Sequence, residues 1–169
     1  WSLPNAADVK ATQNAARQGI APAQFRLSLM YEMGYGVPQN NLKAVKWLRR
    51  AAEQNLVEAQ YNLGSRFESG QGVKQSCPEA IDWFRKAAEQ GFAGAQKNLG
   101  AMYGKGQGVP QDFSEAYVWS SIAAKSGDES AIRNRNLSTS ALSQDDLQIA
   151  EKRASDLYEE IRQRNEKPE

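Results

Sequence analysis

Residues 59–73 read AQYNLGSRFESGQGV, and residues 80–91 read AIDWFRKAAEQG. Both segments recur 36 residues earlier and 36 residues later. The matching columns include a leucine, a Gly-x-Gly-Val turn, a tryptophan and an Ala-Ala pair. The leucine and tryptophan columns are Leu27, Leu63 and Leu99, and Trp47, Trp83 and Trp119. This self-similarity indicates a repeat protein, in which each unit buries its apolar face against its neighbours.

Each repeat divides into two helices. Ala59, Leu63 and Phe67 stand at i, i+4 and i+8, which places them on one face of a first helix. The Gly-x-Gly turn that follows is suited to a left-handed cap. A capping residue, Ser76 in this copy and Asp112 in the next, precedes a Glu by three positions and opens a second helix. The second helices are predicted to end at Asn55, Gly91 and Gly127, residues that tolerate a positive φ.

The two ends of the chain depart from the repeat, as terminal repeats do. We predict a single repeat domain over residues 1–169, with a half-repeat helix at 5–19, full repeats at 23–55, 59–91 and 95–127, and a degenerate repeat with a C-terminal capping helix at 129–165. The capping helix follows Ser143 and should end near Arg164. Its apolar set is Leu147, Ala150, Ala154, Leu157, Tyr158 and Ile161. Residues 165–169 are expected to fray.

The residues in the matching columns are predicted to stabilise the fold rather than to bind a ligand or catalyse a reaction. The tryptophans stand at helical spacing beside Ala-Ala pairs, which favours a core position. Gly64 and Gly100 lie inside first helices, where Gly costs about 1 kcal/mol relative to Ala, so we expect a neighbouring helix to approach closely there. The Gly-x-Gly turns lack the strand and third glycine of a dinucleotide-binding loop. Cys77 has no histidine partner and is predicted to be a surface or edge residue.

The composition argues against several classes of function. The chain has 21 basic and 20 acidic residues, so it lacks the basic excess typical of nucleic-acid binding. Histidine is absent and cysteine occurs once, and we therefore predict no metal and no cofactor. No apolar run approaches the ~20 residues of a membrane-spanning helix, which argues against direct membrane insertion.

The pattern Ala-Gln-x-x-Leu-Gly-x-x-Tyr-x-x-Gly-x-Gly-Val, followed by Ala-x-x-Trp-x-x-x-Ala-Ala-x-x-Gly, resembles the Sel-one-like repeat family. This family is related to tetratricopeptide repeats. The two quoted segments follow the pattern, with Phe67 at the tyrosine position. The resemblance extends over about residues 5–165. It implies an all-α fold, a right-handed α/α solenoid of antiparallel helix pairs with a concave inner face.

The resemblance also implies a function. Family members resemble adaptors in bacterial envelope systems, host interaction and protein quality control. We therefore predict a non-enzymatic scaffold that binds a protein or peptide and is a monomer or weakly self-associating. Some secreted relatives carry a disulfide in each repeat and are credited with beta-lactam binding or hydrolysis. The alternative is therefore a cell-wall or beta-lactam hydrolase. Two observations argue against it: this chain lacks those cysteines, and it has no Ser-x-x-Lys motif at a strained turn.

The sequence also suggests where in the cell the protein is located. The chain begins with Trp1 rather than Met, and the habit of the family favours a bacterial periplasmic or secreted protein. A cytoplasmic location is the alternative, because a single cysteine is compatible with any compartment.

The candidate partner-binding residues stand at positions where the three copies of the repeat differ and where the repeat fold requires no particular residue. The resemblance implies that first helices line the concave side, with exposed positions two before, one before, two after and three after the leucine. The position three after the leucine is Met30, Arg66 and Met102 in the three copies. The predicted partner-binding residues are Phe25, Leu29, Met33, Tyr61, Asn62, Ser65, Arg66, Lys97 and Asn98.

These candidates grade from apolar to polar along the chain. Phe25, Leu29 and Tyr61 would receive apolar side chains of the partner, as anchors in recognition surfaces do. The amide and basic residues would bond to its backbone or to an acidic end. An alternative of equal weight makes Phe25 and Leu29 core residues that contact the N-terminal helix.

Overall fold

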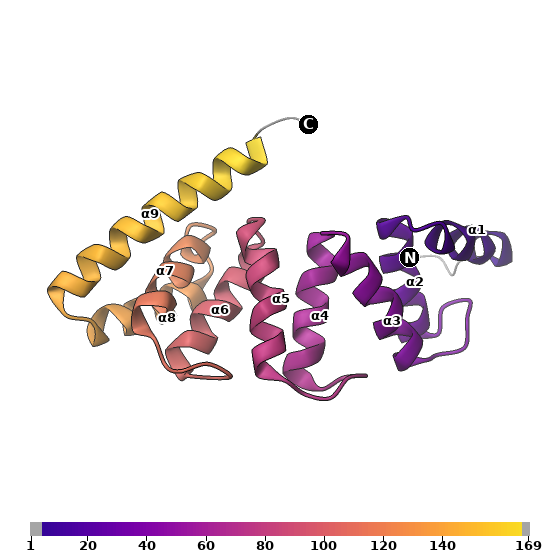
Figure 1. The fold of residues 1–169 in the computed structure, drawn as a ribbon, viewed down its shortest axis with the longest axis horizontal. Coiled ribbons are helices and arrows are strands. Elements are labelled where there is room, and N and C mark those ends of the chain that lie inside the picture. The colour runs from indigo at the N-terminus through magenta and orange to yellow at the C-terminus, as the bar shows by residue number, and fades with distance from the viewer. Residues whose placement is uncertain (1–4, 167–169) are drawn as a thin grey trace. The chain divides into compact units, whose positions relative to one another are not determined.

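The computed structural model describes residues 5–166, which contain nine helices and no strand (Figure 1). The helices are α1 (Ala6–Arg17), α2 (Ala21–Met33), α3 (Asn41–Glu53), α4 (Val57–Ser69), α5 (Cys77–Glu89), α6 (Ala93–Lys105), α7 (Phe113–Ala124), α8 (Glu129–Ala141) and α9 (Gln144–Glu166). The all-α fold that the resemblance implies is therefore confirmed.

The chain divides into two compact units, Trp1–Ser76 and Cys77–Glu169. The first unit holds α1 to α4 and the second holds α5 to α9. The division falls in the turn between the two helices of the second repeat. The first helices of the pairs are α2, α4, α6 and α8, and the helices that follow them are α3, α5, α7 and α9.

Turn residues end the helices as the sequence predicts. The first helices α2, α4 and α6 end at Gly34, Gly70 and Gly106, whose φ angles are 72°, 75° and 66°. Their amide groups donate to carbonyl oxygens of the last helical turn, which satisfies groups that a helix end leaves open. The turns after α3, α5 and α7 also contain a residue of positive φ, namely Asn55, Gly91 and Gly127. The Asp112 carboxylate accepts from the Glu115 amide and caps α7, as expected.

The core of the first unit gathers between α1 and the first repeat. Val9 and Ala16 of α1 are buried with Leu27, Met30 and Val37. Trp47 is half-buried against this cluster, so the prediction of a core tryptophan holds only in part there. The buried Gln24 side-chain amide donates to the Ala16 carbonyl, 3.2 Å away.

The core of the second unit centres on α7, which packs against α6, α8 and α9. Trp83 and Trp119 are buried here, as predicted for their column, with 8% and 2% of their surfaces exposed. Gly100 of α6 faces Ser120 of α7 so closely that a Cβ at Gly100 would lie 2.2 Å from the Ser120 hydroxyl oxygen. The predicted close helix approach at Gly100 is therefore confirmed.

The C-terminal helix α9 covers part of this core (Figure 1). Ala150, Ala154 and Ile161 are buried, and the other three residues of the predicted apolar set are half-buried. The expectation that fraying begins at residue 165 is wrong, because α9 continues to Glu166. The Asn165 side chain donates to the Gln90 carbonyl, 3.1 Å away, which anchors this end of the helix. Residues 167–169 lie outside the described part of the chain.

Candidate functional site

Three of the four first-helix positions expected to face a partner are accessible to varying degrees. Phe25, Tyr61 and Lys97, two before the leucine, are half-buried, and so are Leu29 and Ser65, two after it. Asn62 and Asn98, which stand one position before the leucine, are also half-buried. Met33, at the end of α2, is 52% exposed.

The fourth position, three after the leucine, corrects the prediction. Met30, Arg66 and Met102 are buried, with 5%, 7% and 1% of their surfaces exposed. Expecting these residues to be exposed was wrong, because this side of the helix turns into the packed interior. The repeat uses the position for core contact even where the residue is an arginine.

Arg66 has a specific internal partner that explains its burial. Its guanidinium lies 2.5 Å from the carboxylate of Glu32 on α2, within the first unit. A buried cation needs such a partner, because the charge is otherwise desolvated without compensation. Arg66 therefore joins α4 to α2 instead of offering its charge to a bound molecule.

The two apolar candidates on α2 are neither fully buried nor fully exposed. The buried core cluster around α1 contains Leu27 and Met30, whereas Phe25 and Leu29 lie half-buried outside it. This places them at the margin between the core and the surface. Both retain area with which a bound chain could make contact.

The polar candidates make local hydrogen bonds. The Asn62 side-chain amide donates to the Glu58 carbonyl at 2.7 Å, and the Ser65 hydroxyl donates to the Tyr61 carbonyl at 3.2 Å. Both bonds run back one turn along α4, so the side-chain oxygen atoms of Asn62 and Ser65 can still accept. Asn62 and Ser65 therefore place hydrogen-bond acceptors on the surface of α4 in the first unit.

Lys97 is paired within the second unit. Its ammonium lies 2.9 Å from the carboxylate of Asp128, the residue that caps α8. The hydrogen bond from Lys97 and that from the Ala131 amide lower the pKa of Asp128. Lys97 therefore links α6 to the start of α8. Asn98, the next residue, is half-buried.

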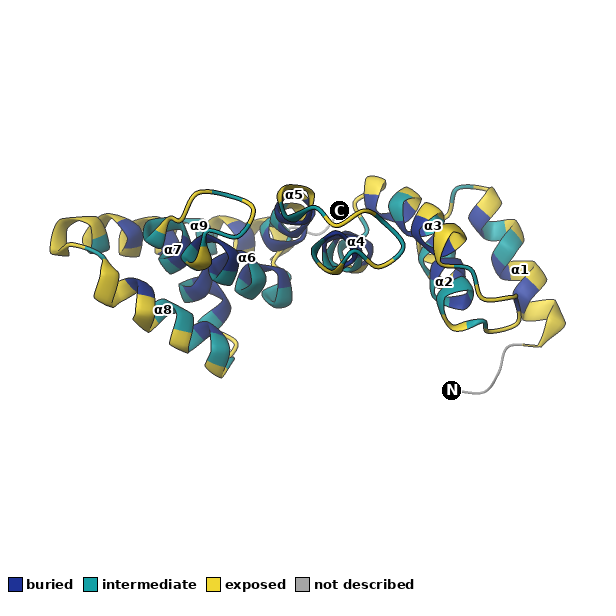
Figure 2. Ribbon diagram, turned by 90° about the horizontal axis from the view of Figure 1, so that it is seen from below, coloured by how far each residue is buried: buried dark blue, intermediate teal, exposed yellow. Residues whose placement is uncertain are grey.

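Sequence reasoning missed an open groove between α6 and α8. It has a volume of about 290 Å³. Its lining is mostly apolar and small: Gly100, Ala101, Gly104, Lys105, Phe113, Asn134, Leu137, Ser138 and Ala141. Leu137 is 68% exposed, and most of α8 is exposed or half-buried (Figure 2). The repeat pattern is lost over α8, so column matching gave no signal for Leu137, although the small residues of α6 were visible in the sequence.

Cys77 is half-buried at the start of α5. Gly108 packs directly on it, since a Cβ at Gly108 would lie 2.5 Å from the Cys77 Cβ. Its environment is thus the turn of the next repeat, and its partial burial agrees with the surface or edge position predicted from the sequence. The part of the chain that the structure describes contains no group of three or more Cys, Asp or Glu residues arranged to hold a metal ion.

The geometry of helix pairs joined by glycine-capped turns agrees with the comparisons. The Sel1 repeat model matches residues 21–56, 57–92 and 93–128, more than half of the chain. The chain belongs to the Sel1-repeat family. Its fold is an α/α solenoid of 36-residue helix pairs, and Sel1 repeats are generally protein-interaction modules without catalytic activity.

Two solved structures illustrate the likeness. A Sel1 repeat protein from Oxalobacter formigenes is 39% identical over 76% of this chain and 97% of its own, with a TM-score of 0.71. A protective antigen present in uropathogenic Escherichia coli strains, which displays an SLR fold, is 28% identical over 96% of this chain, with a TM-score of 0.68. This chain spans 44% of that antigen's length. Comparison with curated proteins gives no significant match. Within the described residues, none of the helices has the length and apolarity to cross a membrane.

Proposed function

We propose that this Sel1-repeat protein is a non-enzymatic scaffold that holds a segment of a partner protein against its first helices. The observation that carries the proposal is the apolar groove between α6 and α8 in the second unit. Exposed apolar surface gathered in a groove is typical of interaction sites. Leu137 at its rim is an accessible anchor for an apolar side chain.

The charges around this groove favour an acidic partner segment. Lys105 is the one charged residue among those that line it. On the neighbouring surface Lys97 pairs with Asp128 and Arg133 with Glu129, so Lys105 supplies the charge that faces the groove. Complementary charge speeds encounter and fixes register. The expected ligand is therefore an extended or helical segment with an apolar residue flanked by Asp or Glu.

The first unit would contribute a second contact region. Phe25, Leu29 and Met33 leave apolar surface accessible on α2, and Asn62 and Ser65 add hydrogen-bonding groups on α4. Several modest contacts suit a repeat protein, which binds without a deep pocket. In this proposal Asn98 adds a polar contact near the groove, while Arg66 and Lys97 act as supports.

A random-peptide display selection on the purified protein tests the proposal. Selected peptides should be enriched in acidic residues next to an apolar one. Leu137→Asp should weaken binding of a selected peptide at least tenfold, about 1.4 kcal/mol or more, because it removes the anchor and repels the acid. The matched control is Leu42→Asp on α3, since Leu42 is also apolar and 76% exposed. Equal affinities of the two variants would show that the groove is not the docking site.

The proposal extends to assembly and location. A scaffold that is a monomer or weakly self-associating should give the mass of a single chain in dilute solution by light scattering. We propose a periplasmic or secreted location in a bacterium; the bacterial origin of both structural relatives named above supports the bacterial source alone. Fractionation of the producing cells tests that location.

A further inference from the structure

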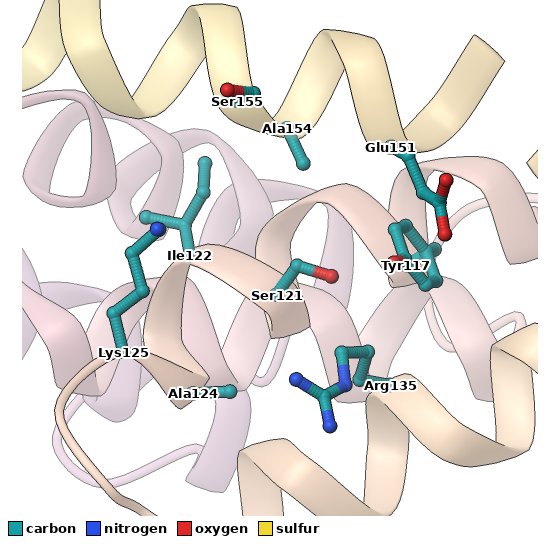
Figure 3. A pocket seen from close by; sticks show the side chains of 9 residues that line it. All are labelled: Tyr117, Ser121, Ile122, Ala124, Lys125, Arg135, Glu151, Ala154 and Ser155. Carbon is teal, nitrogen blue, oxygen red and sulfur yellow. The ribbon is translucent and has the colours of Figure 1, made fainter. Parts of the chain in front are cut away.

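A second hollow in the second unit has a different chemical character. It lies between α7, α8 and α9 and has a volume of about 340 Å³, near the lower end of the range for small-molecule sites, about 300–1,000 Å³. Its lining residues are Tyr117, Ser121, Ile122, Ala124, Lys125, Arg135, Glu151, Ala154 and Ser155 (Figure 3). No residue of the groove between α6 and α8 lines it, so it is independent of the proposed docking site.

Three charged side chains line this pocket and form no ion pair with one another. Lys125, Arg135 and Glu151 line it, and none of the three forms an ion pair among the described residues. Arg135 donates to the Asn136 side-chain oxygen at 3.3 Å. The Lys125 ammonium lies 4.2 Å from the centre of the Tyr158 ring. The pocket thus presents two cations and one carboxylate, an excess of one positive charge.

The hydroxyl of Ser121 adds an unused polar group. Its oxygen is buried and has no hydrogen-bond partner. In Figure 3 this oxygen lies between Lys125 on one side and Tyr117 and Glu151 on the other, above the Arg135 guanidinium. Burying a hydroxyl without a partner costs free energy that a bound oxygen acceptor would recover.

We propose that this pocket binds a small zwitterion of the amino-acid class. The ligand's carboxylate would accept from Arg135, Lys125 and the Ser121 hydroxyl, and its ammonium would lie against Glu151. A guanidinium fits a carboxylate with two parallel bonds. Glu151 in the same pocket disfavours a dianion such as phosphate, because like charges in a partly buried site repel.

The remaining walls indicate the side chain of the ligand. Ile122, Ala124 and Ala154 present apolar surface next to the polar groups. An aliphatic side chain would lie against them and gain from burial. Leucine is therefore the probe of choice.

Titration calorimetry with four ligands tests the site. L-leucine should bind saturably. N-acetyl-leucine lacks the ammonium, leucinamide lacks the carboxylate, and phosphate lacks both the ammonium and the side chain, so each should bind at least tenfold more weakly. Absence of saturable leucine binding at about 10 mM, or phosphate binding as tight as leucine, would overturn the proposal.

Paired variants locate the binding. Arg135→Gln should weaken leucine binding at least tenfold. Arg133→Gln is the matched control, because Arg133 lies on the same helix, is exposed and pairs with Glu129. Glu151→Gln should remove the preference for leucine over N-acetyl-leucine. Equal leucine affinities of the Arg133 and Arg135 variants would refute the assigned pocket.

Ser121→Ala separates ligand binding from folding. Without ligand, its melting temperature should equal or exceed that of the parent protein, because the hydroxyl has no partner to lose. Leucine binding should nevertheless weaken. A folded Ser121→Ala protein with undiminished leucine affinity would contradict the role of this hydroxyl, and circular dichroism of each variant verifies the fold.

Discussion

Trp47 of α3 and Trp119 of α7 stand in the same column of the repeat but differ in burial. Trp119 is 2% exposed, whereas Trp47 is half-buried. Within its unit α3 packs against α2 and α4, while α7 packs against α6, α8 and α9. Helix α9 packs on α7 and adds to the burial of Trp119.

The extra helix beside α7 is tied to it by specific contacts. The Trp119 ring nitrogen donates to the Glu115 carboxylate at 3.2 Å, and Arg153 of α9 forms an ion pair with the same carboxylate. Trp47 instead carries the Arg50 guanidinium over its ring, 4.7 Å from the centre. The Arg50 side chain thus covers Trp47, whereas helix α9 covers Trp119.

The largest expected effect comes from removing the two indoles in turn. Trp119→Ala should lower the free energy of unfolding by about 3–5 kcal/mol, because a large buried side chain leaves a cavity. Trp47→Ala should cost less, about 1–2 kcal/mol, since part of its surface already contacts water. Urea unfolding followed by far-ultraviolet circular dichroism measures both. Equal losses would mean that α9 adds no protection to this column.

A second comparison concerns two glycines of α6. A Cβ at Gly100 would lie 2.2 Å from the Ser120 hydroxyl oxygen, whereas a Cβ at Gly104 would lie 3.6 Å from the Ala116 Cβ, an ordinary contact. Gly100→Ala should therefore destabilise the protein by about 1–3 kcal/mol through overpacking. Gly104→Ala should stabilise it by up to about 1 kcal/mol, because alanine favours the helix.

The double variant Gly100→Ala with Ser120→Ala sharpens this result. Ser120→Ala removes the oxygen that a Cβ at position 100 would meet, and that hydroxyl has no hydrogen-bond partner to lose. Stability should therefore return toward that of the parent protein in thermal melts. A double variant as unstable as Gly100→Ala alone would place the strain in the backbone of α7 instead.

The sequence predicted most of the fold and only part of the candidate site. Helix ends at Gly34, Gly70 and Gly106 could be found because local backbone geometry demands a glycine-like residue there. The pairing of Arg66 could not, since its partner Glu32 lies 34 positions away on another helix. The groove at Leu137 was missed for a related reason: α8 has lost the repeat pattern, and its surface is set by how α6 packs beside it.

The smallest expected effect is a pH dependence at the α6–α8 contact. The folded-state pKa of Asp128 is lowered by the Lys97 hydrogen bond, so the charged carboxylate stabilises the fold at neutral pH. This contribution is lost as the pH falls through the folded pKa, below the usual 3.8 of an aspartate. Asp128→Asn should lower the melting temperature slightly at pH 7, and the difference from the parent protein should vanish in strong acid.

Lys97→Met provides the partner experiment for this ion pair. It removes the largest cause of the lowered Asp128 pKa and should reduce the pH dependence, while the α8 cap and its smaller effect on that pKa remain. The double variant Lys97→Met with Asp128→Asn should cost less than the two single changes added together, because both remove one interaction. Strict additivity would show that the carboxylate acts through the backbone amides of α8 alone.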